Sequence, residues 1–153
     1  MVFEKFEGPW NGVELLGCRN LFYGDRLILD LFEYLQNGPD EEVMIHSETV
    51  SGSHTIGLTA ASRIWRLTFD RPFAVRTRDR DLKLKSEALN NFPSRCCFSE
   101  RSEWIDEFSF TQSLQFFTPT HYVFDLVDNF IEIMGDGSPT VEEIANEISF
   151  GES

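Results

Sequence analysis

Residues 121–134, HYVFDLVDNFIEIM, decide the fold class of this chain. They predict two short strands joined at Asp128-Asn129, a pair of residues that tolerates the positive φ angles of a tight hairpin turn. With this two-residue loop, Asp125 faces Glu132 across the ribbon, and like charges in such positions destabilise a strand pair. The other side of the ribbon is apolar. Its side chains are Tyr122, Phe124, Leu126, Ile131 and Ile133.

The composition agrees with a β-rich fold. The chain has 153 residues, of which 41% are apolar and 15 are phenylalanine. This length predicts one domain, residues 1–153, with enough chain to bury a core. Aromatic and β-branched residues favour strands. We therefore expect an α+β fold, mainly antiparallel β: a single sheet, a sandwich or a partly open barrel, with one or two short helices.

Further strands are predicted outside the hairpin. Residues 63–69 alternate in hydropathy, residues 73–80 do the same after a turn at Asp70-Arg71-Pro72, and residues 95–98 form a short apolar run. Residues 21–37 fit either a helical face ended by Gly38-Pro39 or two strands joined at Gly24-Asp25. We favour the strands, and the helix stays the alternative. Residues 49–62 are small and polar, which is typical of a loop or a weak strand.

Two short helices are predicted in the last third of the chain. The first is capped by Ser99 and runs through Glu107. The second has Ser138 at its N-cap and Pro139 in its first turn, and two glutamates then suit the positive end of the helix dipole. Its apolar face consists of Val141, Ile144, Ala145 and Ile148.

The formal net charge of −13 is distributed unevenly. Residues 1–50 carry a net charge of −7, residues 51–100 carry +4 and residues 101–153 carry −10. An acidic surface repels nucleic acid and anionic membranes, and it attracts basic partners. Simple solubility is the plainer explanation of the same charge. We therefore expect no nucleic-acid or membrane partner and, where a partner is selected by charge, a basic protein.

A row of three arginines, Arg76, Arg78 and Arg80, lies on one face of the strand predicted at residues 73–80. Such a row can bind phosphate, but Asp79 and Asp81 dilute its charge and no aromatic platform accompanies it. We expect these arginines to offset neighbouring acidic strands or to protect a sheet edge.

No motif of a catalytic, metal or cofactor site is present. His46, His54 and His121 show no metal-ligand spacing, and phosphate-binding glycine loops and nucleophile elbows are absent. Cys18 stands alone, and the adjacent Cys96-Cys97 point to opposite faces of a strand, so the cysteines predict buried apolar side chains. The sequence predicts no catalytic residue, no metal, no cofactor and no enzyme activity.

The opening residues lack the basic start and apolar middle of a signal peptide, and no apolar run is long enough to cross a bilayer. Together with the lack of a disulfide framework, this predicts a cytoplasmic protein. The oligomeric state is left open.

Several short patterns resemble a diffuse group of small bacterial β-rich proteins, some of which are predicted immunity proteins of toxin systems. The patterns lie mainly in the C-terminal half, are structural and carry no active-site residues. The resemblance implies an antiparallel β fold and an inhibitory binding role. The patterns are Trp65-x-Leu67-x-Phe69, Phe73-Ala74-Val75-Arg76, Ser102-x-Trp104, His121-Tyr122-Val123, Asp128, Ile131-Glu132-Ile133 and Pro139.

Three functions follow, in order of preference. The first is a small acidic binding protein, such as an immunity protein or inhibitor, that neutralises a basic toxin or nucleic-acid enzyme. The second is a β-barrel or sandwich that holds a small apolar ligand among its phenylalanines, and the third is an enzyme of unspecified reaction. For the first function, the predicted contacts are Asp125, Asp128, Glu132 and Asp136 on the hairpin, with Glu100, Glu103, Asp106 and Glu107 as a second patch.

Overall fold

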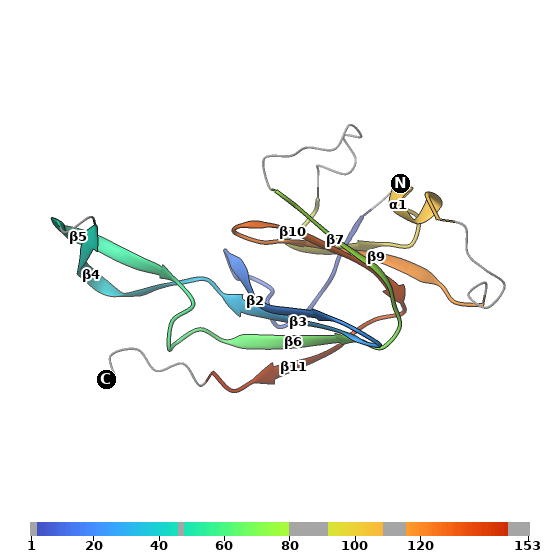
Figure 1. Ribbon diagram of the computed structural model, residues 1–153, viewed down its shortest axis with the longest axis horizontal. Coiled ribbons are helices and arrows are strands. Elements are labelled where there is room, and N and C mark those ends of the chain that lie inside the picture. The colour runs from blue at the N-terminus through green and yellow to red at the C-terminus, as the bar shows by residue number, and fades with distance from the viewer. Residues whose placement is uncertain (1–2, 46–47, 80–91, 109–115, 147–153) are drawn as a thin grey trace.

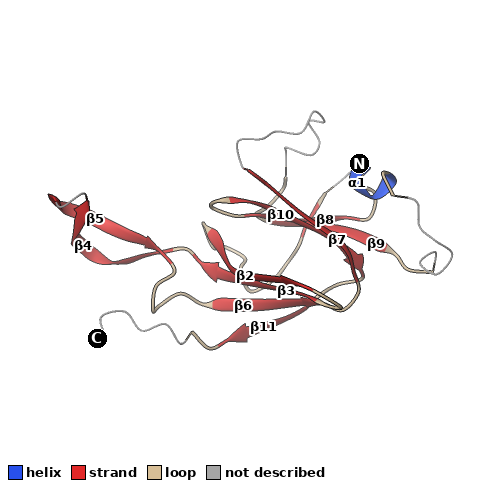
Figure 2. Ribbon diagram, viewed as in Figure 1, coloured by secondary structure: helices blue, strands red, loops and turns tan. Residues whose placement is uncertain are grey.

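Two antiparallel sheets face each other across an aromatic core in the computed structural model (Figure 1). The structure describes residues 3–45, 48–79, 92–108 and 116–146, and for residues 36–57 it describes the backbone alone. Strands dominate these residues, and the short helix stands out at one end of the upper sheet (Figure 2). The predicted mainly antiparallel β fold is thus confirmed, in the form of a sandwich.

The first sheet has the strand order β1-β8-β9-β10-β7, and the second has the order β11-β6-β3-β2. A separate hairpin of β4 and β5 extends from the sandwich (Figure 1). In chain order the elements are β1 (Glu4–Lys5), β2 (Leu16–Tyr23), β3 (Leu27–Glu33), β4 (Leu35–Ile45), β5 (Glu48–Gly57), β6 (Ile64–Phe69), β7 (Pro72–Asp79), β8 (Cys96–Ser99), α1 (Glu103–Asp106), β9 (Pro119–Asp125), β10 (Asn129–Asp136) and β11 (Thr140–Ile144).

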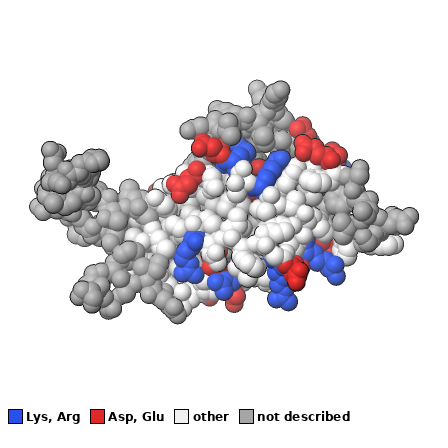
Figure 3. Space-filling view, viewed as in Figure 1, with Lys and Arg blue, Asp and Glu red and all other residues white. Residues whose placement is uncertain are grey.

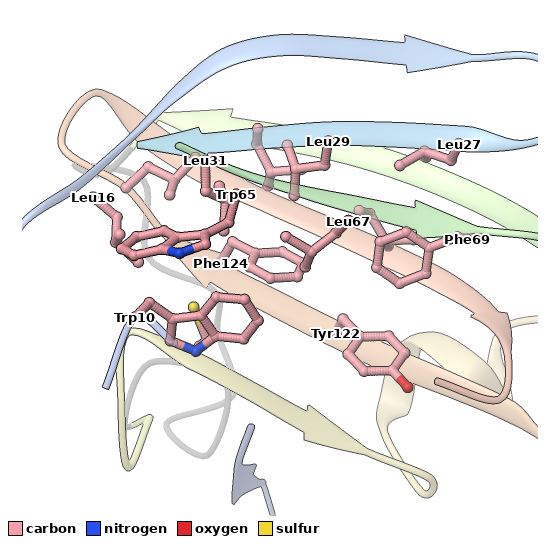
Figure 4. Close-up of a cluster of buried hydrophobic side chains, with 14 residues drawn as sticks. Trp10, Leu16, Leu27, Leu29, Leu31, Trp65, Leu67, Phe69, Tyr122 and Phe124 are labelled. Atoms are coloured by element: carbon pink, nitrogen blue, oxygen red, sulfur yellow. The ribbon is translucent and has the colours of Figure 1, made fainter. Parts of the chain in front are cut away.

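The core lies between the inner faces of the two sheets (Figure 4). Leucines of β3 and alternate residues of β6 meet Tyr122 and Phe124 of β9, because successive strand residues point to opposite faces. The ring of Tyr122 lies 5.3 Å from that of Phe69, and Trp10 closes one end beside Trp65 at 6.4 Å. Trp10 therefore fixes the N-terminal arm onto the core.

The β9–β10 hairpin forms as predicted, but its turn lies one residue earlier than expected. Phe130 pairs with Asp125 and Glu132 pairs with Val123, so the predicted Asp125–Glu132 pair is wrong. The cause is tertiary: Leu126 is buried in the core, and the next residue, Val127, donates its N–H to the Leu16 carbonyl of the opposite sheet. The pairing partner of each residue shifts by two positions, an even number, so the predicted apolar face still points inward.

The segment at residues 21–37 forms strands, as favoured, with its turn between β2 and β3. Residues 49–62 are only partly a loop, because β5 occupies most of them and pairs with β4. The predicted strands at residues 63–69, 73–80 and 95–98 correspond to β6, β7 and β8. No helix in the described part of the chain has the length and apolar character needed to cross a bilayer.

Two helix predictions need correction. The first helix is capped by Ser102 rather than Ser99, because the Ser102 hydroxyl accepts from the Ile105 N–H, whereas the Ser99 hydroxyl accepts from Arg101 in the preceding turn. The second predicted helix is wrong: Thr140–Ile144 is the strand β11, which pairs along β6. Pairing satisfies the backbone groups at the β6 edge, and this outweighs the local helix signals of Ser138 and Pro139.

Candidate binding surface around α1

A buried carboxylate on the outer face of the first sheet organises the region beneath α1. Glu132 of β10 is 0% exposed and accepts from Arg76 through both oxygens, at 3.0 and 3.1 Å. Arg78 adds a contact at 3.4 Å, and the His121 ring nitrogen Nε2 lies 2.8 Å from Oε1 of the carboxylate. The first two members of the predicted arginine row are thus structural, on the edge strand β7, whereas Arg80 lies outside the described residues.

The charge state of this network follows from its geometry. Burial alone raises the pKa of Glu132, but the hydrogen bonds from His121 and Arg76 outweigh it and lower the pKa to about 2. Burial lowers the pKa of His121, and the neighbouring Glu132 carboxylate offsets only part of this effect. Near neutral pH the carboxylate is therefore ionised and the imidazole neutral, and Nε2–H donates to Glu132.

Aromatic rings enclose the histidine and fix α1 on the sheet. The His121 ring lies 4.9 Å from Trp104 of α1 and 5.3 Å from Phe3. The Arg76 guanidinium lies 4.3 Å from the Trp104 ring centroid, a cation–π distance. Ser102 at the N-cap is itself buried and closes the turn. These contacts add to the backbone hydrogen bonds of the four-residue helix, such as that from the Glu107 N–H to the Glu103 carbonyl.

The surface of this turn is acidic, and we call Glu100, Glu103, Asp106 and Glu107 the acidic turn. All four residues are exposed, and in the described part of the chain none of their carboxylates forms an ion pair. Arg101 lies among them in sequence, so residues 100–107 carry four acidic side chains against one basic one. Figure 3 shows a group of carboxylates at the end of the molecule where Figure 1 places α1.

Two exposed phenylalanines follow the acidic turn in sequence. Phe108 is 45% exposed and Phe116 is 85% exposed, whereas the core aromatic rings are buried. The Phe108 ring packs 6.1 Å from Trp104, so it is continuous with the anchored turn. Aromatic side chains are enriched at protein interfaces, where charged residues form the rim.

The four predicted hairpin contacts do not share one environment. Glu132 is buried and bound by arginines, so it does not face a partner. Asp125 is half-buried and accepts from Arg95 at 3.1 Å, and Asp136 is half-buried with Oδ1 accepting from the Thr118 N–H. Asp128 at the turn is exposed. The structure thus separates the predicted hairpin patch, whereas all four residues of the acidic turn are exposed.

A second set of buried carboxylates was not found from the sequence. Asp30 of β3 is 0% exposed and binds Arg66 at 2.9 and 3.0 Å and Arg19 at 3.3 Å. Burial raises the pKa of Asp30, but the arginines outweigh it and hold the pKa below its ordinary value. Glu33 accepts from Arg63 in the same way. The signal was present: Asp30 interrupts an apolar strand, and Arg66 sits opposite at the matching register.

No metal site or other catalytic group is assembled among the described residues. No group of three or more metal-ligand side chains occurs among them, and His121 and Asp125 of β9 bind different partners. Cys96 and Cys97 are buried in separate clusters on opposite faces, as predicted. Burial raises the pKa of each thiol, that of Cys18 to about 11, which opposes thiolate formation. His46 and the side chain of His54 lie outside the described residues.

No family model, curated protein or solved structure matches this chain.

Proposed function

We propose that this chain is an acidic binding protein that docks a basic protein onto the acidic turn and the neighbouring Phe108. The observation that carries the proposal is the division of its carboxylates into two classes. Those on the sheet faces, Glu132, Asp30 and Glu33, are neutralised by arginines, whereas the carboxylates of the acidic turn form no ion pair within the described part of the chain. Unneutralised charge on a fixed surface speeds encounter with a basic partner and rejects acidic ones.

The rigidity of the turn supports this role. Trp104 is buried and packs on both His121 and Arg76, so the carboxylates around it project from a fixed base. A preorganised surface loses less conformational entropy when a partner binds. An immunity protein or an inhibitor of a basic toxin or nucleic-acid enzyme is the form of this function that we favour.

Co-expression of the tagged chain with the products of neighbouring genes tests the proposal, followed by calorimetry on any retained basic protein. We expect the double variant Glu103→Gln/Asp106→Asn to bind about 10-fold more weakly and with a smaller salt dependence. The matched variant Glu142→Gln/Glu143→Gln removes the same charge from exposed positions on β11 and keeps wild-type affinity. Equal affinity of the two variants would show that net charge, not the acidic turn, governs binding.

The second function, the binding of a small apolar ligand, would use a cavity of about 280 Å³. It opens between β2 and the β9–β10 hairpin, and its lining includes Leu21, Leu126 and Ile131. Ligand pockets usually exceed about 300 Å³. The phenylalanines expected to hold the ligand instead pack ring to ring, as Phe69 and Phe124 do on opposite sheets. Native mass spectrometry that detects a carried apolar molecule would favour this function over the first.

A further inference from the structure

A small cavity lies directly beside the acidic turn, at the end of the first sheet where β8 stops and β9 begins. Its volume is about 100 Å³. One of its walls is Glu100, the first residue of the acidic turn, and the other walls come from three segments far apart in sequence. The lining residues are Phe6, Phe98, Glu100, Thr120, Tyr122, Gly137 and Ser138.

Three aromatic rings form the apolar part of the lining. Phe6 lies 5.2 Å from Tyr122 and 6.3 Å from Phe98, and Phe98 lies 6.2 Å from Tyr122. The Phe6 ring is inclined by 61° to Tyr122 and by 83° to Phe98, so the three rings do not stack as a closed layer. Aromatic rings attract a cation that lies against their faces, so this wall of the cavity tolerates positive charge.

The polar part of the lining carries negative charge and no positive charge. No lysine or arginine is among the residues that line the cavity. Glu100 supplies an exposed carboxylate with no ion pair among the described residues, and its charge acts on the Tyr122 hydroxyl. That hydroxyl donates to the Gly137 carbonyl at 2.7 Å and is also hydrogen-bonded by the Ser138 side chain, so one lone pair of its oxygen remains to accept a hydrogen bond. Rings, acceptors and one carboxylate together favour a cationic group.

The size of the cavity decides between a whole ligand and a side-chain head group. A volume of about 100 Å³ admits only a group of a few heavy atoms. This is well below the pockets of free small-molecule ligands. We propose that the cavity is a socket for the ammonium head group of a lysine side chain, presented by the basic protein that docks on the acidic turn. The proposal rests on the proposed function for the source of the lysine.

The test uses n-butylammonium chloride as the probe, titrated into the isotopically labelled full chain and followed by amide chemical shifts. We expect millimolar binding, with the largest shifts at Phe98, Glu100 and Tyr122. Glu100→Gln weakens binding at least 5-fold, and Phe98→Leu, which keeps apolar bulk but removes a ring, weakens it by a similar factor. Glu107→Gln removes the same charge from a residue that does not line the cavity and leaves binding within 2-fold of wild type.

Three outcomes would overturn the socket: equal shifts with neutral n-butanol, an equal effect of Glu100→Gln and Glu107→Gln, or tighter binding of n-butylguanidinium than of n-butylammonium. The first two indicate apolar or diffuse binding, and the third indicates arginine. The proposed function fails separately. If butylammonium enters the cavity but no basic protein is retained, the docking function is wrong and the socket stands. If a basic protein binds the acidic turn and its affinity is the same for Phe98→Leu as for the wild type, the docking function stands and the socket is wrong.

Discussion

Glu132 changes role when its environment is known. On the sequence it is one more carboxylate of an acidic tail, yet it is fully buried between two arginines and a histidine. A buried ion pair is weak evidence of net stabilisation, because desolvation offsets its Coulomb energy. Removing one partner is different, since the remaining charges stay buried without compensation. Glu132 is therefore a structural counter-ion, and its contribution to stability is seen when the carboxylate is removed.

Glu132→Gln should lower the free energy of unfolding by about 3 kcal/mol, because the Arg76 guanidinium loses the buried carboxylate whose two oxygens it binds. Chemical denaturation at neutral pH measures the change. Asp70→Asn is the matched control: its ion pair with Arg26 is mostly exposed, and such pairs contribute less than about 1 kcal/mol. A loss of under 1 kcal/mol in Glu132→Gln would contradict the assigned role.

The same network predicts acid lability in two stages. The pKa of His121 is lowered in the folded chain. When the pH falls below the ordinary pKa of 6.5, the unfolded state therefore binds a proton that the folded state does not bind. Glu132 has a pKa lowered from 4.5 to about 2, and its stabilisation is complete above 4.5 and lost as the pH falls towards 2. Both effects reduce stability with acid. Urea titrations from pH 7 to 2 should show a continuous fall that Asp70→Asn retains. A flat profile from pH 6.5 to 4.5 would contradict the assignment of a neutral buried His121.

At the scale of elements, the hairpin shows what pattern alone can specify. Alternation gave the two strands and the inward face of 121–134 correctly, because the two-residue period depends on neighbouring residues only. The position of the turn could not be predicted from this pattern, because a hydrogen bond from the Val127 N–H to the Leu16 carbonyl of the opposite sheet sets it. The acidic turn was likewise predictable as a patch. The sequence did not predict that Glu132, unlike the acidic turn, is neutralised. Its neutralisation depends on the register of β7 and β10, which places Arg76 opposite Glu132.

β11 is the element where local and tertiary preferences conflict most. Residues 138–145 carry a helix cap, a first-turn proline and two early glutamates, yet Thr140–Ile144 pair with β6. Asn146 completes the attachment: its side-chain amide donates to the Thr59 and Ser62 carbonyls, each at 2.9 Å. The edge of β6 offers more hydrogen bonds than an isolated short helix could keep in water.

Substitutions at Glu143 separate strand from helix, because the residue is exposed and lies opposite Trp65. Glu143→Val and Glu143→Ala remove the same charge. A strand favours valine, and we expect that variant to be more stable by roughly 0.5–1 kcal/mol in thermal or chemical unfolding. A helix favours alanine. The reverse order of stability would therefore contradict the assignment of β11.

At the scale of the whole molecule, most of the positive charges that the structure describes are committed to internal contacts. Arginines at positions 63, 66, 76 and 95 each hold a carboxylate of the same chain. Exposed acids such as those of the acidic turn have no ion pair among the described residues, and they contribute to the formal net charge of −13. Self-repulsion of this kind destabilises the compact state while it keeps the protein soluble.

Salt should therefore stabilise the protein. Between 10 mM and 500 mM NaCl the screening length falls from about 30 Å to a few Å, which removes repulsion between exposed carboxylates but barely affects the buried pairs of Glu132 and Asp30. We expect the unfolding midpoint in calorimetry to rise by about 2–4 °C, equivalent to roughly 1 kcal/mol for a chain of this size. Glu103→Gln/Asp106→Asn should begin from a higher midpoint at low salt and respond less. A midpoint that falls with NaCl would mean that exposed ion pairs, such as Arg26 with Asp70, outweigh the repulsion.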